Sequence, residues 1–191
     1  MNKSDIDAVI LAGGRAQRMQ GQDKGLIVFK QKPLIAHVTD ALKNTVDSIW
    51  VSANRNLDAY QAFGQVLSDE LSDFQGPLAG IVTALKKTDK NHLLVVPCDG
   101  PYLHPILLER LAETMLKTGA KSCVAVENGH MHPTFALIHT DMRKPLEKYL
   151  DSGERRLGKF FSDHQAQMVD FSDDPQLFVN LNSPKDFTTN A

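Results

Sequence analysis

Short apolar runs alternate with segments of helical periodicity along most of the chain. Apolar runs typical of strands are found at 8–11, 48–53, 66–67, 92–97 and 122–126. Between them, apolar residues recur every three to four positions, which predicts helices at 33–44, near 57–63, after Gly76-Pro77 and around 107–115. This alternation predicts an α/β fold with three layers, in which helices cover both faces of a mostly parallel sheet with right-handed crossovers.

The run 92–97 is apolar at nearly every position, which is the pattern of a central parallel strand buried on both faces. In such sheets, ligands bind at the carboxyl ends of the strands. The loops that follow Leu11, Ala53, Leu67 and Pro97 are therefore expected to meet at one edge of the sheet.

The last third of the chain is less regular. It predicts a turn at 127–130, a strand at 134–139, helices at 141–150 and 154–161, and short strands at 167–171 and 178–181. Ser183, Pro184 and Asp186 mark the start of a further helix, with a cap residue, a proline and an acid in the first turn. We find no repeat, low-complexity tract or linker, so residues 1–191 are expected to form one domain.

The composition is that of an ordinary globular domain, with 42% hydrophobic and 23% charged residues among 191. A net charge of −2 argues against a general nucleic-acid binder. Basic residues nevertheless concentrate in 15–32 and 143–159, and this distribution favours a small anionic ligand. The two cysteines imply no disulfide framework. No apolar segment has the length of a signal peptide or a membrane span, so a cytoplasmic protein without a membrane partner is expected.

The first strand opens into a loop, residues 12–25, that combines four glycines with three basic side chains, Arg15, Arg18 and Lys24. Glycine lets the backbone turn tightly and brings N–H groups close to a ligand, and the cations add positive charge. The spacing matches neither G-x-G-x-x-G nor G-x-x-x-x-G-K-[ST]. We interpret the loop as a polyphosphate-binding loop, with a plain glycine-rich surface turn as the alternative.

Asp99 directly follows the buried run and lies between Pro97 and Pro101. A carboxylate in this place can bind a Mg²⁺ ion that bridges phosphate oxygens, and without the metal it would lack a counter-ion. The alternative is an aspartate that accepts hydrogen bonds in a turn. The position opposite the glycine loop favours the metal. Asp69, after the third strand, is a second candidate, with a solvated loop acid as a nearly equal alternative.

Two other features are predicted to carry no catalysis. His130 and His132 would point to one side of a strand, but no third metal ligand accompanies them, so roles as polar turn residues or substrate contacts are favoured. Cys98 adjoins Asp99, yet no base accompanies it in the pattern, so it is expected to be a small core residue.

Several motifs together resemble one family over essentially the whole chain. They are Leu11-Ala12-Gly13-Gly14, Asp23-Lys24-Gly25-Leu26, Gly76-Pro77-Leu78-Ala79-Gly80, Pro97-Cys98-Asp99, Gly153-Glu154-Arg155-Arg156 and Asn180-Leu181-Asn182-Ser183-Pro184. The sequence resembles the molybdenum cofactor guanylyltransferases, which are nucleotidyltransferases with a Rossmann-like fold. Any nucleotidyltransferase could show the first loop, whereas the second, fourth and last motifs are much more specific to this family.

The resemblance implies an enzyme that uses Mg²⁺ to transfer GMP from GTP to molybdenum-loaded molybdopterin, with release of pyrophosphate. It implies a GTP-binding N-terminal part and a molybdopterin-binding C-terminal part. The implied contacts to the nucleotide are Leu11, Ala12, Gly13, Ser52 and Asp69. The implied catalytic residues are Arg18 and Lys24 at the phosphates and Asp99 as the Mg²⁺ ligand. The implied pterin side consists of Arg155, Arg156, Asn180 and Asn182.

The chain departs from the family pattern at two positions. Gln20 replaces a usual glycine, and Ser52 stands where an asparagine is often found near the base, so that Asn54 is a possible substitute on the same strand face.

Two alternatives stay open. One is a cytidylyltransferase of molybdopterin or of another phosphorylated metabolite, whose first loop would read Leu-Ala-Ala-Gly; Gly13 favours guanine instead. The other is a noncatalytic module that delivers cofactor to a partner; Lys24 and Asp99 favour catalysis. Delivery to molybdoenzymes or their chaperones can still accompany catalysis.

Overall fold

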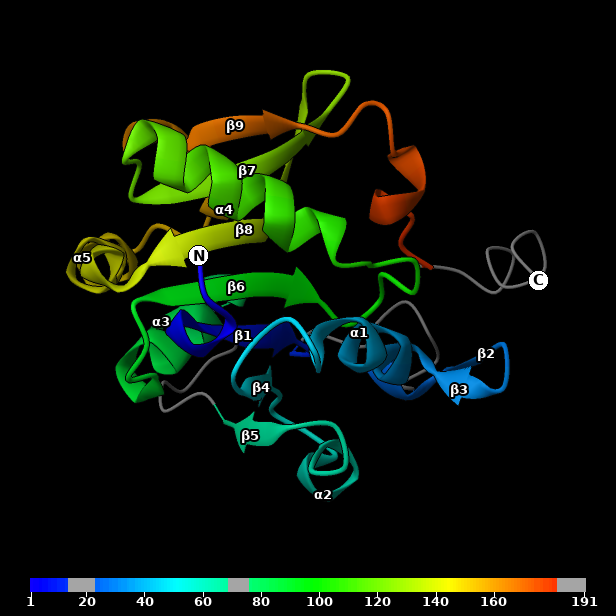
Figure 1. Ribbon diagram of the computed structural model, residues 1–191. Coiled ribbons are helices and arrows are strands. Elements are labelled where there is room, and N and C mark those ends of the chain that lie inside the picture. Colours follow the sequence, from blue (N-terminus) through cyan, green and yellow to red (C-terminus); the bar gives the residue numbers. More distant parts are fainter. Residues whose placement is uncertain (14–22, 69–75, 182–191) are drawn as a thin grey trace.

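The computed structural model describes residues 1–13, 23–68 and 76–181, which build a seven-stranded sheet between two layers of helices (Figure 1). The strand order is β5-β4-β1-β6-β8-β7-β9. The strands are β1 (Ile6–Leu11), β4 (Ile49–Ser52), β5 (Gln65–Leu67), β6 (His92–Pro97), β7 (Ser122–Glu127), β8 (His130–His139) and β9 (Gln167–Asp170). Only β8 runs against its neighbours, so the predicted mostly parallel sheet is confirmed.

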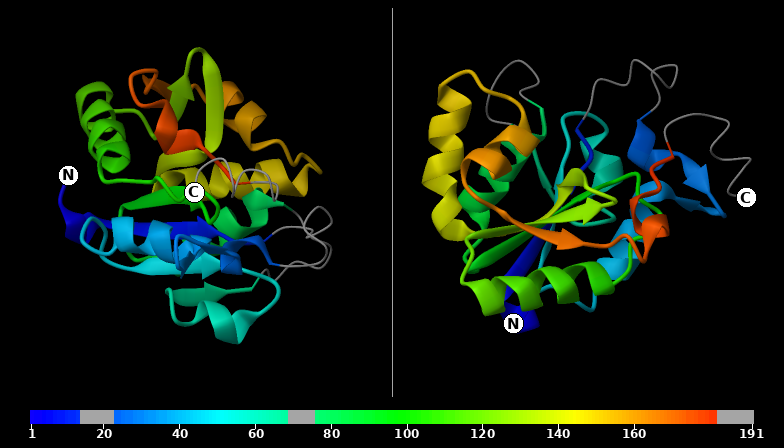
Figure 2. Two further views of the ribbon diagram at one scale, coloured as in Figure 1. Left: turned by 90° about the vertical axis from the view of Figure 1, so that its right-hand side faces the viewer. Right: turned by 90° about the horizontal axis from the view of Figure 1, so that it is seen from above.

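The helices cover both faces of this sheet, as the alternation predicts (Figure 2). They are α1 (Leu34–Leu42), α2 (Leu57–Tyr60), α3 (Pro77–Lys87), α4 (Ile106–Thr118), α5 (Arg143–Asp151) and α6 (Leu157–Asp163). Helices α1 and α4 pack on one face, and α3, α5 and α6 on the other. None of the helices in the described part of the chain is long and apolar enough to cross a membrane.

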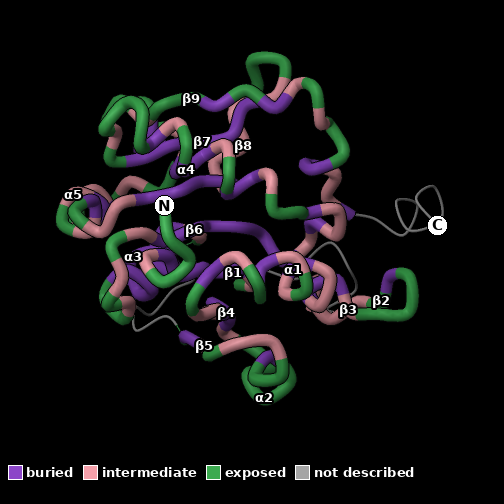
Figure 3. The backbone as a smooth tube through the Cα atoms, in the orientation of Figure 1, coloured by how far each residue is buried: buried purple, intermediate pink, exposed green. Residues whose placement is uncertain are grey.

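Strand β1 shows why the sheet needs both layers. Successive side chains of a strand point to opposite faces, and Ala8 and Ile10 pack with α1 and α4 while Val9 and Leu11 pack with α3. All four are buried, and burial of a large aliphatic side chain contributes about 1.5–3 kcal/mol. The buried core therefore follows the strands through the middle of the molecule (Figure 3).

The β7–β8 hairpin explains the one antiparallel strand. Asn128 and Gly129 have φ values of 48° and 77°, which is the left-handed pair required by a two-residue hairpin turn. The predicted turn at 127–130 is thus confirmed, and it starts β8 at His130 rather than 134. As a result β6 is central and buried as predicted, but it is parallel only to β1 and antiparallel to β8.

Two local predictions differ from the structure. The predicted strand at 178–181 is wrong, because Pro175–Phe178 form a 3-10 helix (η4) and Phe178 packs against the ring of Phe135. The small hairpin of β2 (Val28–Phe29) and β3 (Lys32–Pro33) was not predicted, since Lys30 and Gln31 supply its left-handed turn without a glycine. The helix predicted from Ser183 lies outside the described residues.

Candidate active site

The parallel strands end at one common edge, which we call the carboxyl edge. Leu11 of β1 is in register with Ser52 of β4 and with Pro97 of β6, and Ser52 is in register with Leu67 of β5. Backbone hydrogen bonds continue past the strand ends, from the Ala12 N–H to the Ser52 carbonyl at 2.8 Å. The four strands therefore end at one edge as predicted, although most of the loops after Leu11 and Leu67 lie outside the described residues.

Lys24 and Asp99 form an ion pair at the carboxyl edge. Asp99 follows β6 after Cys98, and Lys24 begins a 3-10 turn, η2 (Lys24–Leu26), so the fold joins two residues that are 75 positions apart. Their side chains are 25% and 14% exposed, so the pair is partly accessible to solvent. The structure thus places the predicted phosphate-binding cation beside the predicted metal ligand.

Cys98 lies beneath this pair as a buried side chain. Burial raises the pKa of the Cys98 thiol, and the neighbouring Asp99 carboxylate raises it further. A thiol held in its neutral form is a poor nucleophile. The prediction that Cys98 is a core residue rather than a nucleophile agrees with this environment.

The end of β1 faces β4 and α3. A Cβ atom built on Gly80 of α3 would lie 2.2 Å from the Ser52 Oγ atom, so only glycine lets α3 approach this closely. The Ser52 hydroxyl is therefore packed under α3, and the Ser52 side chain is buried. The Asn54 amide nitrogen instead lies 3.8 Å from a Cβ built on Gly13, beside the predicted nucleotide-binding backbone.

Asn180 comes to the carboxyl edge from the C-terminal part of the chain. The Leu181 N–H donates to the Asp99 carbonyl at 3.2 Å, and the Asn180 Oδ1 atom lies 3.6 Å from a Cβ built on Gly100. The structure therefore brings one residue of the predicted pterin side next to the predicted metal ligand.

Arg155 and Arg156 lie between α5 and α6. The Arg155 guanidinium donates to the carbonyls of Leu150 and Glu154, at 2.7 and 2.8 Å, and so caps the end of α5. The Arg156 carbonyl accepts a hydrogen bond from the Tyr149 hydroxyl. Sequence reasoning missed the capping role of Arg155; the positive φ of Gly153, 87°, is the backbone signal of this helix end.

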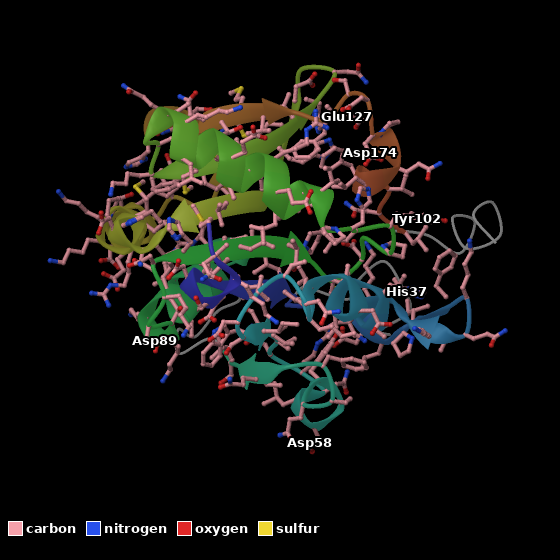
Figure 4. All side chains as sticks on the ribbon, viewed as in Figure 1. His37, Asp58, Asp89, Tyr102, Glu127 and Asp174 are labelled. Atoms are coloured by element: carbon pink, nitrogen blue, oxygen red, sulfur yellow. The ribbon has the colours of Figure 1, made fainter. Side chains whose placement is uncertain are left out.

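His132 has aromatic and carboxylate neighbours. Its ring stacks on Phe178 with centroids 4.0 Å apart, and its Nε2 atom lies 3.2 Å from an oxygen of Glu127. Burial lowers the pKa of His132. No group of three or more His, Cys, Asp or Glu side chains in the described ranges could hold a metal, so a metal pair at His130 and His132 gains no support. Figure 4 labels Glu127 in the upper part of the molecule.

Three predicted site residues, Arg18, Asp69 and Asn182, lie outside the described residues, as does Gln20. Their roles stay predictions.

Solved structures with the same fold include a protein of molybdopterin-guanine dinucleotide biosynthesis and a nucleotidyl transferase. The molybdopterin-guanine dinucleotide biosynthesis protein A from Archaeoglobus fulgidus superposes with a TM-score of 0.76 at 20% identity, over 96% of this chain and 95% of that one. A nucleotidyl transferase from Methanothermobacter thermautotroptrophicus gives a TM-score of 0.76 at 19% identity, over 97% and 95% of the two chains. These similarities establish the Rossmann-like nucleotidyltransferase fold.

Sequence comparison is more specific. Residues 8–168 match the family model of the MobA-like NTP transferase domain. A molybdenum cofactor guanylyltransferase from Shewanella sediminis is 44% identical over 94% of this chain and 92% of its own length. One from Histophilus somni is 46% identical over 95% and 93%. The chain belongs to the molybdenum cofactor guanylyltransferases, a family of nucleotidyltransferases with the MobA-like NTP transferase domain.

Proposed function

We propose that this chain transfers GMP from GTP to molybdenum-loaded molybdopterin, forming molybdopterin guanine dinucleotide and pyrophosphate. The observation that carries the proposal is the Lys24–Asp99 ion pair at the carboxyl edge, where a cation for phosphate and a carboxylate for a metal lie side by side. The two alternatives, a cytidylyltransferase and a noncatalytic module, are less well supported, because the relatives of this chain are named guanylyltransferases.

The nucleoside would lie over the end of β1. Leu11, Ala12 and Gly13 offer backbone there, and the absence of a Cβ on Gly13 leaves room beside the Asn54 amide. The base contact predicted for Ser52 is better served by Asn54, since the Ser52 hydroxyl packs under α3. We propose that Asn54 contacts the base and that Ser52 supports it from behind.

Lys24 would neutralise the phosphates of the nucleotide, together with Arg18 from the glycine loop. Nucleotidyl transfer needs alignment of the reacting groups and compensation of charge on the phosphate oxygens, and lysine serves as a compact point charge. The nucleophile is a terminal phosphate of the acceptor, which is already anionic. We therefore assign no general base.

Asp99 fits the requirements of a Mg²⁺ ligand. Mg²⁺ takes oxygen ligands and is usually held by one or two carboxylates together with substrate phosphates and water, so a single carboxylate at the strand end is sufficient. We propose that Asp99 holds the metal and that Asp69 contributes near the nucleoside. Bound Mg²⁺ would supply charge neutralisation at the reacting phosphate and at the leaving pyrophosphate.

The acceptor side is assigned to the C-terminal part of a single domain, 1–191. Asn180 lies beside Gly100, so a pterin phosphate held there would be close to Asp99. Arg155, Arg156 and Asn182 are proposed as further contacts, although the Arg155 guanidinium is already bound to two carbonyls. Delivery of the product to cytoplasmic molybdoenzymes or their chaperones is part of the same proposal.

GTP is expected to bind more tightly than CTP or ATP. The reason is the Asn54 amide nitrogen beside Gly13, which suits the polar edge of guanine. Calorimetric titration of the three nucleotides with Mg²⁺ should show a preference of about tenfold or more, or ~1.4 kcal/mol. Asn54→Ala should reduce this preference. Tighter binding of CTP would overturn the assignment of the nucleotide.

A further inference from the structure

Lys24 sits in a turn whose preceding residue is tied to α2. The Asp23 Oδ1 atom accepts a hydrogen bond from the Tyr60 hydroxyl at 2.5 Å, and Oδ2 accepts one from the Asn56 side-chain amide at 3.2 Å. Both carboxylate oxygens of Asp23 are therefore engaged by α2 and its cap residue. The side chain of Lys24 goes instead to Asp99, so two neighbouring residues reach two different elements.

Tyr60 is suited to hold Asp23 in this way. Its side chain is fully buried in the core between α2 and the sheet. Burial raises the pKa of the Tyr60 phenol, and the hydrogen bond to Asp23 raises it further, so the hydroxyl keeps its proton and donates it. A hydrogen bond from a hydroxyl to a carboxylate is about twice as strong as one between neutral groups.

Gly25, on the other side of Lys24, is also fitted against Tyr60. A Cβ built on Gly25 would lie 2.7 Å from the Tyr60 hydroxyl oxygen and 3.3 Å from the Cys98 sulfur. The turn thus packs between Tyr60 of α2 and Cys98 at the end of β6. Cys98 is the residue before Asp99 in the chain. Tyr60 therefore contacts both residues that flank Lys24 in the chain.

We propose that Tyr60 and Asp23 are positioning residues that hold the Lys24 ammonium group against Asp99 and in line with the incoming phosphates. This inference rests on the proposed function of Lys24. An Asp23 carboxylate released from Tyr60 would no longer fix the turn that carries Lys24, and its charge would repel the triphosphate. Its hydrogen bonds to Tyr60 and Asn56 keep that charge on α2, away from Lys24.

The first test needs no nucleotide. Tyr60→Phe removes one oxygen and keeps the ring, and Asp23→Asn removes the charge. Modification of Lys24 by an amine-reactive reagent, followed by peptide mass spectrometry, should be several-fold faster in both variants than in the wild type, because a loosened ammonium group is more accessible. Equal rates would overturn the proposal.

Thr88→Val is the matched control for loss of a partly buried hydroxyl that donates to a carboxylate. The Thr88 hydroxyl donates to the buried Asp7 carboxylate at 2.6 Å, at the edge of the sheet where β1 begins. Its neighbour Asp89 lies on the opposite side of the molecule from Tyr102, which follows β6 (Figure 4). This variant should lose thermal stability as Tyr60→Phe does, with no change in Lys24 labelling or in turnover.

The second test uses GMP transfer. Tyr60→Phe should lower kcat by about tenfold with less than a threefold change in the KM for GTP. The Lys24 charge would still be present to bind GTP, but it would be misaligned with the phosphates in the transition state. In a Lys24→Ala background the same substitution should have no further effect on kcat. An unchanged kcat, or fully additive effects, would overturn the positioning role. If the wild type transfers no GMP, the proposed function fails, and the labelling rates still decide whether Tyr60 holds Lys24.

Discussion

Asp99→Asn is expected to reduce magnesium-dependent pyrophosphate release by about 100-fold or more, equivalent to ~2.7 kcal/mol of transition-state stabilisation. The substitution keeps the shape of the strand end and removes the charge that the metal requires. Binding of GTP without metal should persist, because Leu11–Gly13 and Lys24 remain. Pyrophosphate release and GTP binding, each measured with and without Mg²⁺, give the comparison.

The stability of the same variant separates a metal ligand from a structural aspartate. Loss of the partly exposed ion pair with Lys24 should cost no more than about 1 kcal/mol in the free energy of unfolding. Asp40→Asn is the control, since Asp40 is ion-paired with Lys32 and Lys43 and has no part in the proposed chemistry. A large loss of stability with intact magnesium dependence would contradict the metal role.

Lys24→Ala is expected to lower turnover by about tenfold or more, or at least ~1.4 kcal/mol, because the charge that it removes matters most as pyrophosphate leaves. The side chain is only a quarter exposed and pairs with Asp99, so a small drop in the thermal midpoint should accompany the loss. Steady-state kinetics and circular dichroism of the purified variant measure both effects.

Lys43→Ala serves as the control for Lys24→Ala, because it also removes a lysine from an ion pair, in this case an exposed pair with Asp40. Its turnover should equal that of the wild type. Wild-type turnover in Lys24→Ala would mean that the turn after the glycine loop does not hold phosphate.

The fold could be predicted where local pattern and tertiary structure agree. Strand β6 is buried on both faces and is therefore apolar at nearly every position. Helix α4 is buried on one face and therefore has apolar residues every three to four positions. The reversal of β8 could not be predicted from periodicity, which carries no strand direction. The apolar residues of 178–181 resemble a strand in the sequence. In the structure, however, the Phe178 ring packs against the rings of His132 and Phe135, and the segment pairs with no strand among the described residues.

The site could be predicted in its parts but not in its contacts. Asp99 could be recognised because it follows a buried strand, and Lys24 because it belongs to a family motif. Their ion pair could not be predicted, because the two residues are 75 positions apart and no local pattern encodes the contact. From the sequence, Asp99 was expected to lack a counter-ion without metal; this was wrong, because Lys24 supplies one. Tyr60 was missed entirely, since a buried tyrosine in a short helix looks like any core residue until Asp23 is placed beside it.

Transfer of GMP to molybdopterin is tested most directly by identification of the product. The wild-type protein would be incubated with Mg²⁺, molybdenum-loaded molybdopterin and each of GTP, CTP and ATP, and the dinucleotide and pyrophosphate would be quantified by chromatography and mass spectrometry. We predict a guanine dinucleotide and pyrophosphate in equal amounts with GTP, and little product with the other two nucleotides. A cytosine dinucleotide as the main product, or GTP bound but never converted, would contradict the account.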